Sequence, residues 1–522
     1  MGQNAAWGRF PGGIGYWVTR RAQLAPERWA VADVDRTLNW RDFNSRVNRL
    51  AQALAARGIG YQDRVAVLLW NSIPFMEAVF AAAKLGAVLV PVNYRLAPPE
   101  AEYILQDSGA LLLLAHEGLR DLAIAAMPPD RIIWVAAPGT SSDDSPYEAL
   151  LAGSQPEEPE VPVSPDDIHI MMYTSGTTGR PKGAELSHGN ATWNAIQLML
   201  HEAQLHHDDV VLTVAPLFHI GGLGVHTLPA FYLGAPVVLL PRFDPVTVKD
   251  AIQRYQVTAL FMVPAMWQAF AQQPEFDRYD LSSLRVLVSG GAPCPIPVIE
   301  FYQSRGLTFL EGFGMTETAP NTMILGANDA IRKHGSIGRP LFYQEARVVD
   351  EAGDDVPRGQ VGELVLRGPN IFRGYWHKPQ ATEEAFRGGW FHTGDLARVD
   401  DEGFFYLVDR KNDLVISGGE NVYPIEVEQT LVRHPHIAEA AVIGVPDPRW
   451  GEVPLAVVVP KDLQHPVSVG EVQQFCRGRL AGFKIPKVVV TVEELPRNAT
   501  GKVLKTVLRE QYHAMSEDGR DQ

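Results

Sequence analysis

A loop of glycines and hydroxyl residues, YTSGTTGRPKG at residues 173–183, constrains the fold of this chain more than any other segment. It follows the apolar run 168–172, which is typical of a buried strand, and precedes residues 186–200, which read as a helix. Glycines let such a loop present backbone N–H groups to an anion, hydroxyls add donors, and the start of the helix adds positive potential. The segment therefore predicts a phosphate site. The groups expected to hold the phosphate are Thr174, Ser175, Gly176, Thr177, Thr178, Gly179 and Lys182.

This loop does not match the phosphate loop of kinases and GTPases, which requires G-x-x-x-x-G-K-[ST]. Counted from Gly176, the sixth position is Pro181, and Gly183 follows Lys182 where a hydroxyl would be needed to hold magnesium. The other interpretation, a surface loop without a ligand, is disfavoured because ten loop-type residues cluster between apolar runs.

Further motifs follow in a fixed order along the chain. They are PLFHIGG at 216–222, EGFGMTE at 311–317, GELVLRG at 362–368, WFHTGDL at 390–396, DRKNDLVISGGENVYPIEVE at 409–428 and PRNATGK at 496–502. Together with the loop, this series resembles the adenylate-forming superfamily of acyl-CoA synthetases, aryl-CoA ligases, luciferases and adenylation domains. The resemblance spans about residues 20–505 and is greatest to bacterial fatty-acid-CoA ligases.

Alternating apolar and amphipathic segments predict an α/β fold built from βα units with a parallel sheet. Strands are expected at 63–70, 88–92, 284–288 and 307–310, and helices at 72–85 and 98–106. Residues 138–167 are rich in Pro, Ser, Asp and Glu and are expected to be a surface connection. A small α+β unit should follow, with helices at 423–434 and 468–480 and strands at 438–445, 453–460 and 488–492. We therefore predict a large N-terminal domain, 1–410, and a small mobile C-terminal domain, 411–522.

The resemblance implies that a carboxylate attacks the α-phosphate of ATP to give an acyl-adenylate, from which the thiol of CoA then displaces AMP. ATP, CoA and Mg²⁺ are thus expected. Since both reactants of the first step are anions, positioned cations and N–H donors are its main requirement. The resemblance makes Glu317 the Mg²⁺ ligand, Thr316 an α-phosphate contact and Lys502 the adenylation lysine. It places the rest of the nucleotide against Gly291, Ala292, Pro293, Glu311, Gly312, Phe313, Asp395 and Arg410.

The acyl group is expected beside His219, which we interpret as a wall of the site because the acid is already ionised at neutral pH. The predicted pocket is lined by Phe218, Gly222, Leu223, Gly290, Gly314 and Met315. It holds no arginine for a second carboxylate, which disfavours a dicarboxylate. A medium- or long-chain fatty acid is the first expectation, and an aromatic acid such as a coumarate or benzoate is the second.

The resemblance assigns the thioester-forming side to Ser417, Gly418, Gly419 and Glu420. Between the domains the family usually has an Asp or Lys as the hinge about which the small domain rotates. Here that position is Asn412, a residue type that tolerates unusual backbone angles. We therefore expect the hinge to work without the usual charge.

Composition excludes several other partners. With 46 basic and 61 acidic residues the net charge is −15, so nucleic acid is not expected as a partner. Two cysteines provide no disulfide framework, and the glycine- and proline-broken N-terminus lacks a secretory signal, so a cytoplasmic setting is expected. The longest apolar stretch, 223–241, is interpreted as core rather than a membrane span, which leaves peripheral membrane contact open. We expect a monomer or a homodimer.

Three other functional classes share parts of this pattern. An enzyme that loads a carrier protein would keep every motif up to Lys502, but no carrier domain follows it in this sequence. A luciferase-like oxygenase shares the adenylation step. A nucleotide sensor without catalysis is disfavoured because Lys182, Glu317, Asp395 and Lys502 are all intact.

Overall fold

The computed structural model describes residues 12–140, 145–174, 180–201, 205–292, 294–410, 413–418, 420–462, 467–497 and 503–512, except for the side chain of Arg410. Internal contacts divide the chain into two compact units. The first comprises Met1–Glu345 and Leu366–Phe391, and the second comprises Ala346–Val365 and His392–Gln522. Our expected boundary at residues 410–411 remains a prediction.

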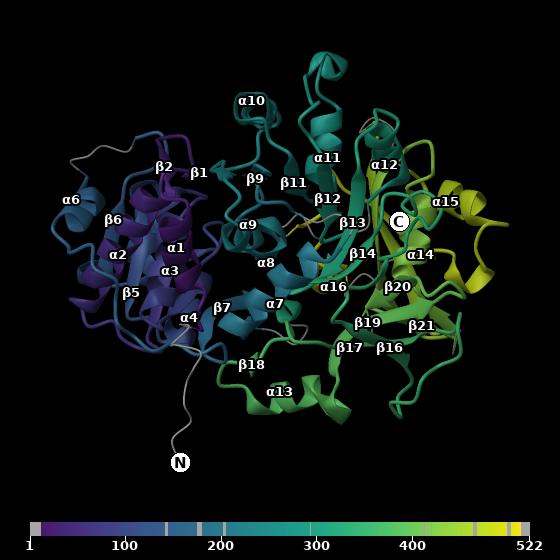
Figure 1. Cartoon of the computed structure of the whole chain (residues 1–522). Coiled ribbons are helices and arrows are strands. Elements are labelled where there is room, and N and C mark those ends of the chain that lie inside the picture. The colour runs from purple at the N-terminus through teal and green to yellow at the C-terminus, as the bar shows by residue number, and fades with distance from the viewer. Residues whose placement is uncertain are drawn as a thin grey trace. The chain divides into compact units, whose positions relative to one another are not determined.

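One sheet of the first unit has seven strands in the order β18-β8-β7-β4-β3-β5-β6. These are β3 (Arg64–Leu68), β4 (Val88–Pro91), β5 (Leu112–His116), β6 (Ile132–Val135), β7 (Ile168–Thr174), β8 (Lys182–Ser187) and β18 (Gly374–Tyr375). Strands β3 to β7 pair in parallel, while β8 is antiparallel to both β7 and β18. Alternate side chains of a strand face opposite sides of a sheet. Ala66 and Leu68 of β3 share a buried cluster with α4 (Pro98–Ser108) and α5 (Arg120–Ala126). Helix α3 (Ile73–Lys84) packs against α2 (Trp40–Ala55) (Figure 1).

The second sheet of this unit has nine strands in the order β15-β14-β13-β12-β11-β9-β10-β1-β2. Its strands are β1 (Trp29–Ala32), β2 (Thr37–Asn39), β9 (Val211–Thr213), β10 (Val237–Leu239), β11 (Ala259–Met262), β12 (Val286–Gly290), β13 (Phe309–Gly314), β14 (Asn321–Leu325) and β15 (Arg339–Pro340). Further helices of this unit are α1 (Gly15–Leu24), α7 (His188–Met199), α8 (Ile220–Gly222), the π-helical turn η3 (Leu223–Thr227), α9 (Leu228–Leu233), α10 (Pro245–Tyr255), α11 (Pro264–Ala271), α12 (Ile296–Gln303) and α13 (Pro379–Ala385). Because β9 to β13 are parallel, their carboxyl ends meet at one edge, where an open α/β sheet builds its binding site.

The second unit contains most of a four-stranded sheet formed by β16 (Glu345–Val349), β17 (Gly362–Arg367), β19 (Phe391–Val399) and β20 (Phe405–Arg410). A separate sheet comprises β21 (Val415–Ser417), β22 (Glu420–Val422), β23 (Ile437–Asp447), β24 (Gly451–Pro460) and β25 (Val488–Thr491). Helices α14 (Pro424–Leu431), α15 (Val469–Cys476) and α16 (Lys505–Tyr512) accompany it. Two buried apolar clusters form around this second sheet, so the unit has its own core.

The predicted α/β class is confirmed, as is the order of βα units around residues 63–106. Two local expectations were wrong. Residues 138–167 contain a short helix, α6 (Pro146–Ala152), which Ser145 caps by accepting a hydrogen bond from the N–H of Glu148 (3.3 Å). Residues 182–187 form β8, because their backbone pairs with β7. No helix in the described parts of the chain is long and apolar enough to cross a membrane.

Candidate active site

Thr174 and Lys182 form the base of the predicted phosphate loop. They end β7 and begin β8, and they are direct partners across the two strands. Residues 175–179, which include Ser175, Gly176, Thr177, Thr178 and Gly179, lie outside the described residues. The expectation that the following helix adds to this anion site was wrong. Strand β8 separates Lys182 from the start of α7 by about 17 Å of extended chain.

The carboxylate expected to bind Mg²⁺ is held in a short turn after β13. Glu317 is 6% exposed, its carboxylate accepts a hydrogen bond from the hydroxyl of Tyr375 (2.9 Å), and its carbonyl accepts one from the N–H of Phe372 (2.8 Å). The ammonium of Lys182 lies 5.2 Å from the centroid of the Tyr375 ring. Tyr375 therefore lies between the phosphate-loop lysine and the acidic residue. Sequence reasoning missed it, because nothing in the local pattern distinguishes this tyrosine from other aromatic residues.

The neighbouring residues of EGFGMTE occupy β13 and the turn. Gly312, Phe313, Met315 and Thr316 are all partly exposed. A Cβ on Gly314 would lie 1.7 Å from the carbonyl oxygen of Pro320, so the close approach of two backbone segments requires glycine there. Gly314 thus has a steric role in addition to its predicted place beside the acyl group.

Glu311 holds the loop that was predicted to contact adenine. Its carboxylate accepts a hydrogen bond from the N–H of Cys294 (3.1 Å), and its Oε1 atom finds no partner among the described residues. Burial raises the pKa of Glu311 to about 7. Gly291 has φ of +85°, and both Gly291 and Ala292 are exposed, whereas Pro293 lies outside the described residues. Glu311 therefore supports the 291–294 loop from behind.

Both cysteines are buried, Cys294 behind this loop and Cys476 in the core of the second unit. Burial, followed by the nearby Glu311, raises the pKa of the Cys294 thiol to about 12. Burial also raises the pKa of Cys476.

His219 lies at the start of α8, with its ring 4.5 Å from that of Phe218, which in turn packs on Tyr94. Its Nε2 atom has no partner among the described residues. Burial and the nearby Arg95 lower the pKa of His219 to about 4, so the ring is neutral at pH 7. Such a ring can act as a wall or a hydrogen-bonding group, but it provides no positive charge.

Phe261 of β11 is the aromatic centre of this region, and sequence reasoning missed it. A Cβ on Gly221 would lie 3.2 Å from one edge of its ring, and a Cβ on Gly290 would lie 3.3 Å from the other. A Cβ on Gly222 would instead lie 2.3 Å from the carbonyl oxygen of Pro216, so Gly222 is packed against backbone. Leu223 is fully buried. Gly221 and Gly290 therefore let the backbone lie close to the two edges of the Phe261 ring, which is 8% exposed.

The residues of the second unit that were predicted to bind the ribose or to serve thioester formation lie in two antiparallel pairs. Asp395 of β19 is 7% exposed and faces Arg410 of β20 in the register of the strands. Ser417 and Glu420 pair at the end of the β21–β22 hairpin. Gly418, with φ of +61°, donates its N–H to the carbonyl of Trp450 (2.7 Å). Gly419, Asn412 and Lys502 lie outside the described residues, as does the side chain of Arg410.

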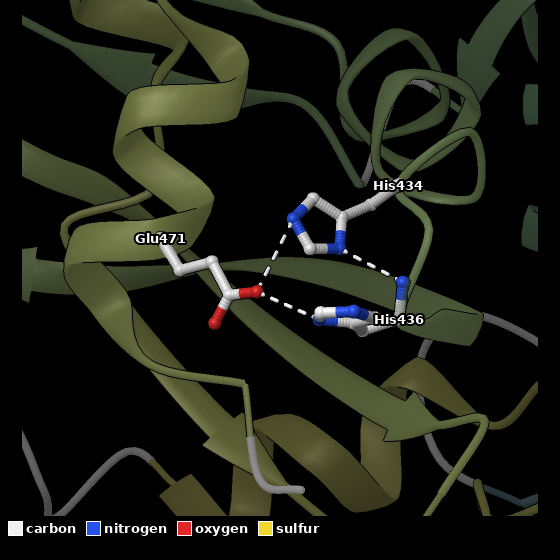
Figure 2. Close-up of side chains that lie close together, drawn as sticks. All are labelled: His434, His436 and Glu471. Carbon is white, nitrogen blue, oxygen red and sulfur yellow. Dashed lines mark hydrogen bonds and ion pairs between the residues drawn. The ribbon is translucent and has the colours of Figure 1, made fainter.

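The described residues contain one cluster of metal-ligand types, His434, His436 and Glu471, shown in Figure 2. His434 and His436 lie in the turn after α14, and Glu471 lies in the first turn of α15. The Nδ1 atom of His434 accepts the N–H of His436 (3.2 Å), which leaves the proton of the neutral ring on Nε2, 3.7 Å from Glu471. A metal at Nε2 would have to displace that proton. We therefore interpret the cluster as a polar link between the turn and α15.

A hydroxyl and a lysine at the neck of a glycine-rich loop, next to a buried carboxylate at the carboxyl edge of a parallel sheet, are the groups that an ATP-using, adenylate-forming enzyme requires. Family models agree with this class. The model described as AMP-binding enzyme matches residues 18–376, and the model described as AMP-binding enzyme C-terminal domain matches residues 426–502. The chain therefore belongs to the AMP-binding enzyme family, within the adenylate-forming superfamily.

Named relatives and solved structures match nearly the whole chain. A feruloyl-CoA synthase of Amycolatopsis sp is 44% identical over 96% of this chain and 99% of the relative. A long-chain-fatty-acid–CoA ligase of Mycobacterium tuberculosis is 38% identical over 96% of this chain and 99% of its own. The o-succinylbenzoate-CoA synthetase of Bacillus subtilis, solved with ATP and a magnesium ion, superposes with a TM-score of 0.83 at 35% identity, covering 94% of this chain and 99% of that one.

Proposed function

We propose that this chain is an aryl-CoA ligase. It is an AMP-forming acid–thiol ligase that uses ATP, CoA and Mg²⁺. A carboxylate oxygen forms a bond to the α-phosphorus of ATP, and the bond to the β-phosphate breaks to release pyrophosphate. The CoA thiol, having lost its proton, then attacks the acyl carbon and releases AMP.

The preference for an aromatic acid rests on Phe261, whose two ring edges are flanked by Gly221 and Gly290. A planar wall with glycines at its edges favours a flat substrate, because rings stack or meet edge to face at short distances. The 44% identity to a feruloyl-CoA synthase, against 38% to a fatty-acid ligase, supports the same choice. From the sequence a fatty acid was the first expectation and an aromatic acid the second, and these two observations reverse that order.

The residues around the loop fit Mg²⁺ and the phosphates of ATP. Glu317 offers carboxylate oxygens, which Mg²⁺ prefers, and Lys182 offers a cation close to them. When bound, Mg²⁺ neutralises charge on the phosphates. Lys182 and Thr174 hold the phosphate side, while the neutral ring of His219 bounds the acyl side. No general base is needed for the first step, because the acid is already ionised at neutral pH.

The remaining site roles stay proposals that rest on the matching motifs. Thr316 contacts the α-phosphate, Asp395 and Arg410 bind the ribose, and Lys502 assists adenylation. Ser417, Gly418, Gly419 and Glu420 serve thioester formation, and Asn412 is the hinge residue. The partners proposed for this chain are small molecules, and we propose that it acts as a monomer or a homodimer.

The test is pyrophosphate release together with CoA consumption, measured on ferulate, 4-coumarate, benzoate, octanoate and palmitate. We expect kcat/KM to be highest for a hydroxycinnamate. A higher value for octanoate or palmitate would contradict the aromatic assignment in favour of a fatty acid. Pyrophosphate release without CoA consumption would contradict the CoA ligase itself.

A pair of glycine substitutions tests whether the ring binds beside Phe261. Gly221→Ala should lower kcat/KM for ferulate about 10-fold or more relative to benzoate, because one methyl group in a tight pocket has an effect of this size. Gly470→Ala, at an exposed glycine with open space around it, is the matched control and should leave the ratio unchanged. An unchanged ratio in Gly221→Ala would place the aromatic ring elsewhere.

A further inference from the structure

The segment 372–376 is hydrogen-bonded to both of the elements that carry the phosphate-side groups. The N–H of Phe372 donates to the carbonyl of Glu317 (2.8 Å). The N–H groups of Arg373 and Trp376 donate to the carbonyls of Glu185 (2.9 Å) and Gly183 (2.8 Å), in the strand that Lys182 begins. This segment therefore connects the Glu317 turn to β8 through backbone bonds alone.

Tyr375 makes the same connection with its side chain. Its hydroxyl donates to Oε1 of Glu317 (2.9 Å), and its ring lies under the Lys182 ammonium at 5.2 Å. A tyrosine hydroxyl keeps its proton at neutral pH, so it is available as the donor to Glu317. The ring is also fixed from behind, because Phe372 packs edge-on at 4.9 Å.

We propose that Tyr375 is a positioning residue for the ATP–Mg²⁺ site, which fixes the rotation of the Glu317 carboxylate through its hydroxyl and the place of Lys182 through its ring. It acts through these two residues and contacts no reacting atom itself. The proposal rests on the proposed function only for the use of ATP and Mg²⁺, and it holds whichever acid is activated.

Two physical effects follow from this arrangement. A carboxylate without its hydrogen-bond donor can rotate, and loss of such a supporting partner typically lowers metal affinity or activity 10- to 100-fold. A lysine without an aromatic face loses a cation–π contact, so its position becomes less defined. The hydroxyl therefore governs the response to Mg²⁺, and the ring governs the binding of the phosphates.

The test measures ATP binding to the full-length protein by titration calorimetry, once with EDTA and once with Mg²⁺. The ratio of the two affinities is the tightening that Mg²⁺ confers. Tyr375→Phe, which keeps the ring, should reduce this ratio about 10- to 100-fold and leave binding in EDTA unchanged. Tyr375→Leu should weaken binding in EDTA as well. If Tyr375→Phe left the ratio unchanged, for example by weakening ATP binding equally in EDTA and in Mg²⁺, the proposal would be overturned.

Two controls separate positioning from a structural role. Tyr302→Phe removes another buried tyrosine hydroxyl, which donates to the carbonyl of Trp267 (2.7 Å), and should leave both affinities unchanged. In a Glu317→Gln background, Tyr375→Phe should cause no further change in the ratio, because the two residues act as one unit. An additional loss in that background would contradict action through Glu317. If the parent protein failed to bind ATP, the proposed function itself would be wrong, whereas failure of every tested acid would leave the binding result intact.

Discussion

Glu311 illustrates how a single buried carboxylate can support the loop that was predicted to contact adenine. Its carboxylate is buried, and it accepts one hydrogen bond, from the Cys294 N–H that ends the exposed Gly291–Ala292 turn. A buried carboxyl with one donor favours its protonated form, which is why the pKa of Glu311 rises to about 7. The residue therefore changes charge near physiological pH.

This pKa predicts a pH-dependent stability. The folded value lies above the unfolded value, so the native state holds the proton more tightly, and the stabilising contribution is lost as pH rises from about 4.5 to about 7. Relative to Glu311→Gln, the parent should lose roughly 3 kcal/mol of unfolding free energy between pH 4.5 and pH 8. Urea unfolding at both pH values measures the difference. Glu300→Gln, at an exposed position of α12, should keep the pH dependence of the parent.

The sequence could single out Lys182, Glu317 and Asp395 as candidates because each lies in a contiguous motif whose chemistry is readable. Tyr375 and Phe261 could not be found in this way. Tyr375 meets Glu317 only because β18 pairs with β8, and Phe261 meets Gly221 and Gly290 only because three separate segments converge. The sequence also did not show in which direction each pocket residue faces. Gly221 and Gly222 are neighbours in sequence, yet one faces a ring and the other a carbonyl.

At the scale of elements, a buried ionic network joins three helices of the first unit. Arg46 of α2 donates to the carboxylates of Glu77 on α3 and Glu148 on α6, and the hydroxyl of Tyr147 also donates to Glu77. The Glu77 side chain is fully buried. Helix α6 was not predicted, because its seven residues lie in a polar, proline-rich segment and tertiary contacts such as this network fix its position.

Removal of one partner from this network should destabilise the first unit strongly. Arg46→Met leaves Glu77 buried without its cation, and we expect a loss of about 3–5 kcal/mol in unfolding free energy. Arg46→Met combined with Glu77→Met should recover much of that loss, because no uncompensated charge remains. Arg278→Met breaks an exposed pair with Glu275 and should cost under about 1 kcal/mol. Chemical unfolding of the parent and the three variants compares these values, and a small effect of Arg46→Met alone would contradict the assignment.

At the scale of the whole molecule, the α/β class followed from the alternation of apolar and amphipathic segments. The compact units are not marked in the same way. The chain leaves the first unit after residue 345, returns to it for residues 366–391 and leaves it again, and no composition change marks those points. Which strands join into one sheet depends on pairing between distant segments, so a reading along the chain cannot identify a unit that the chain enters twice.

Each unit has a buried apolar cluster of its own, so each should unfold as a separate cooperative transition. Leu431→Ala, in the core of the second unit, should reduce the unfolding free energy of one calorimetric transition by about 3 kcal/mol and leave the other transition unchanged. Leu113→Ala, in the core of the first unit, should do the reverse. A single transition that both substitutions lower together would contradict independent cores.

The two buried cysteines have a consequence for an enzyme that makes an activated acyl group and passes it to a thiol. A protein thiol that was accessible and ionised would compete with the intended acceptor and acylate the enzyme itself. Cys294 is 2% exposed, with its pKa raised to about 12, and Cys476 is fully buried, so both are withheld from that side reaction. The native protein should accordingly stay almost silent to a colorimetric thiol reagent, and CoA consumption can be followed directly in its presence.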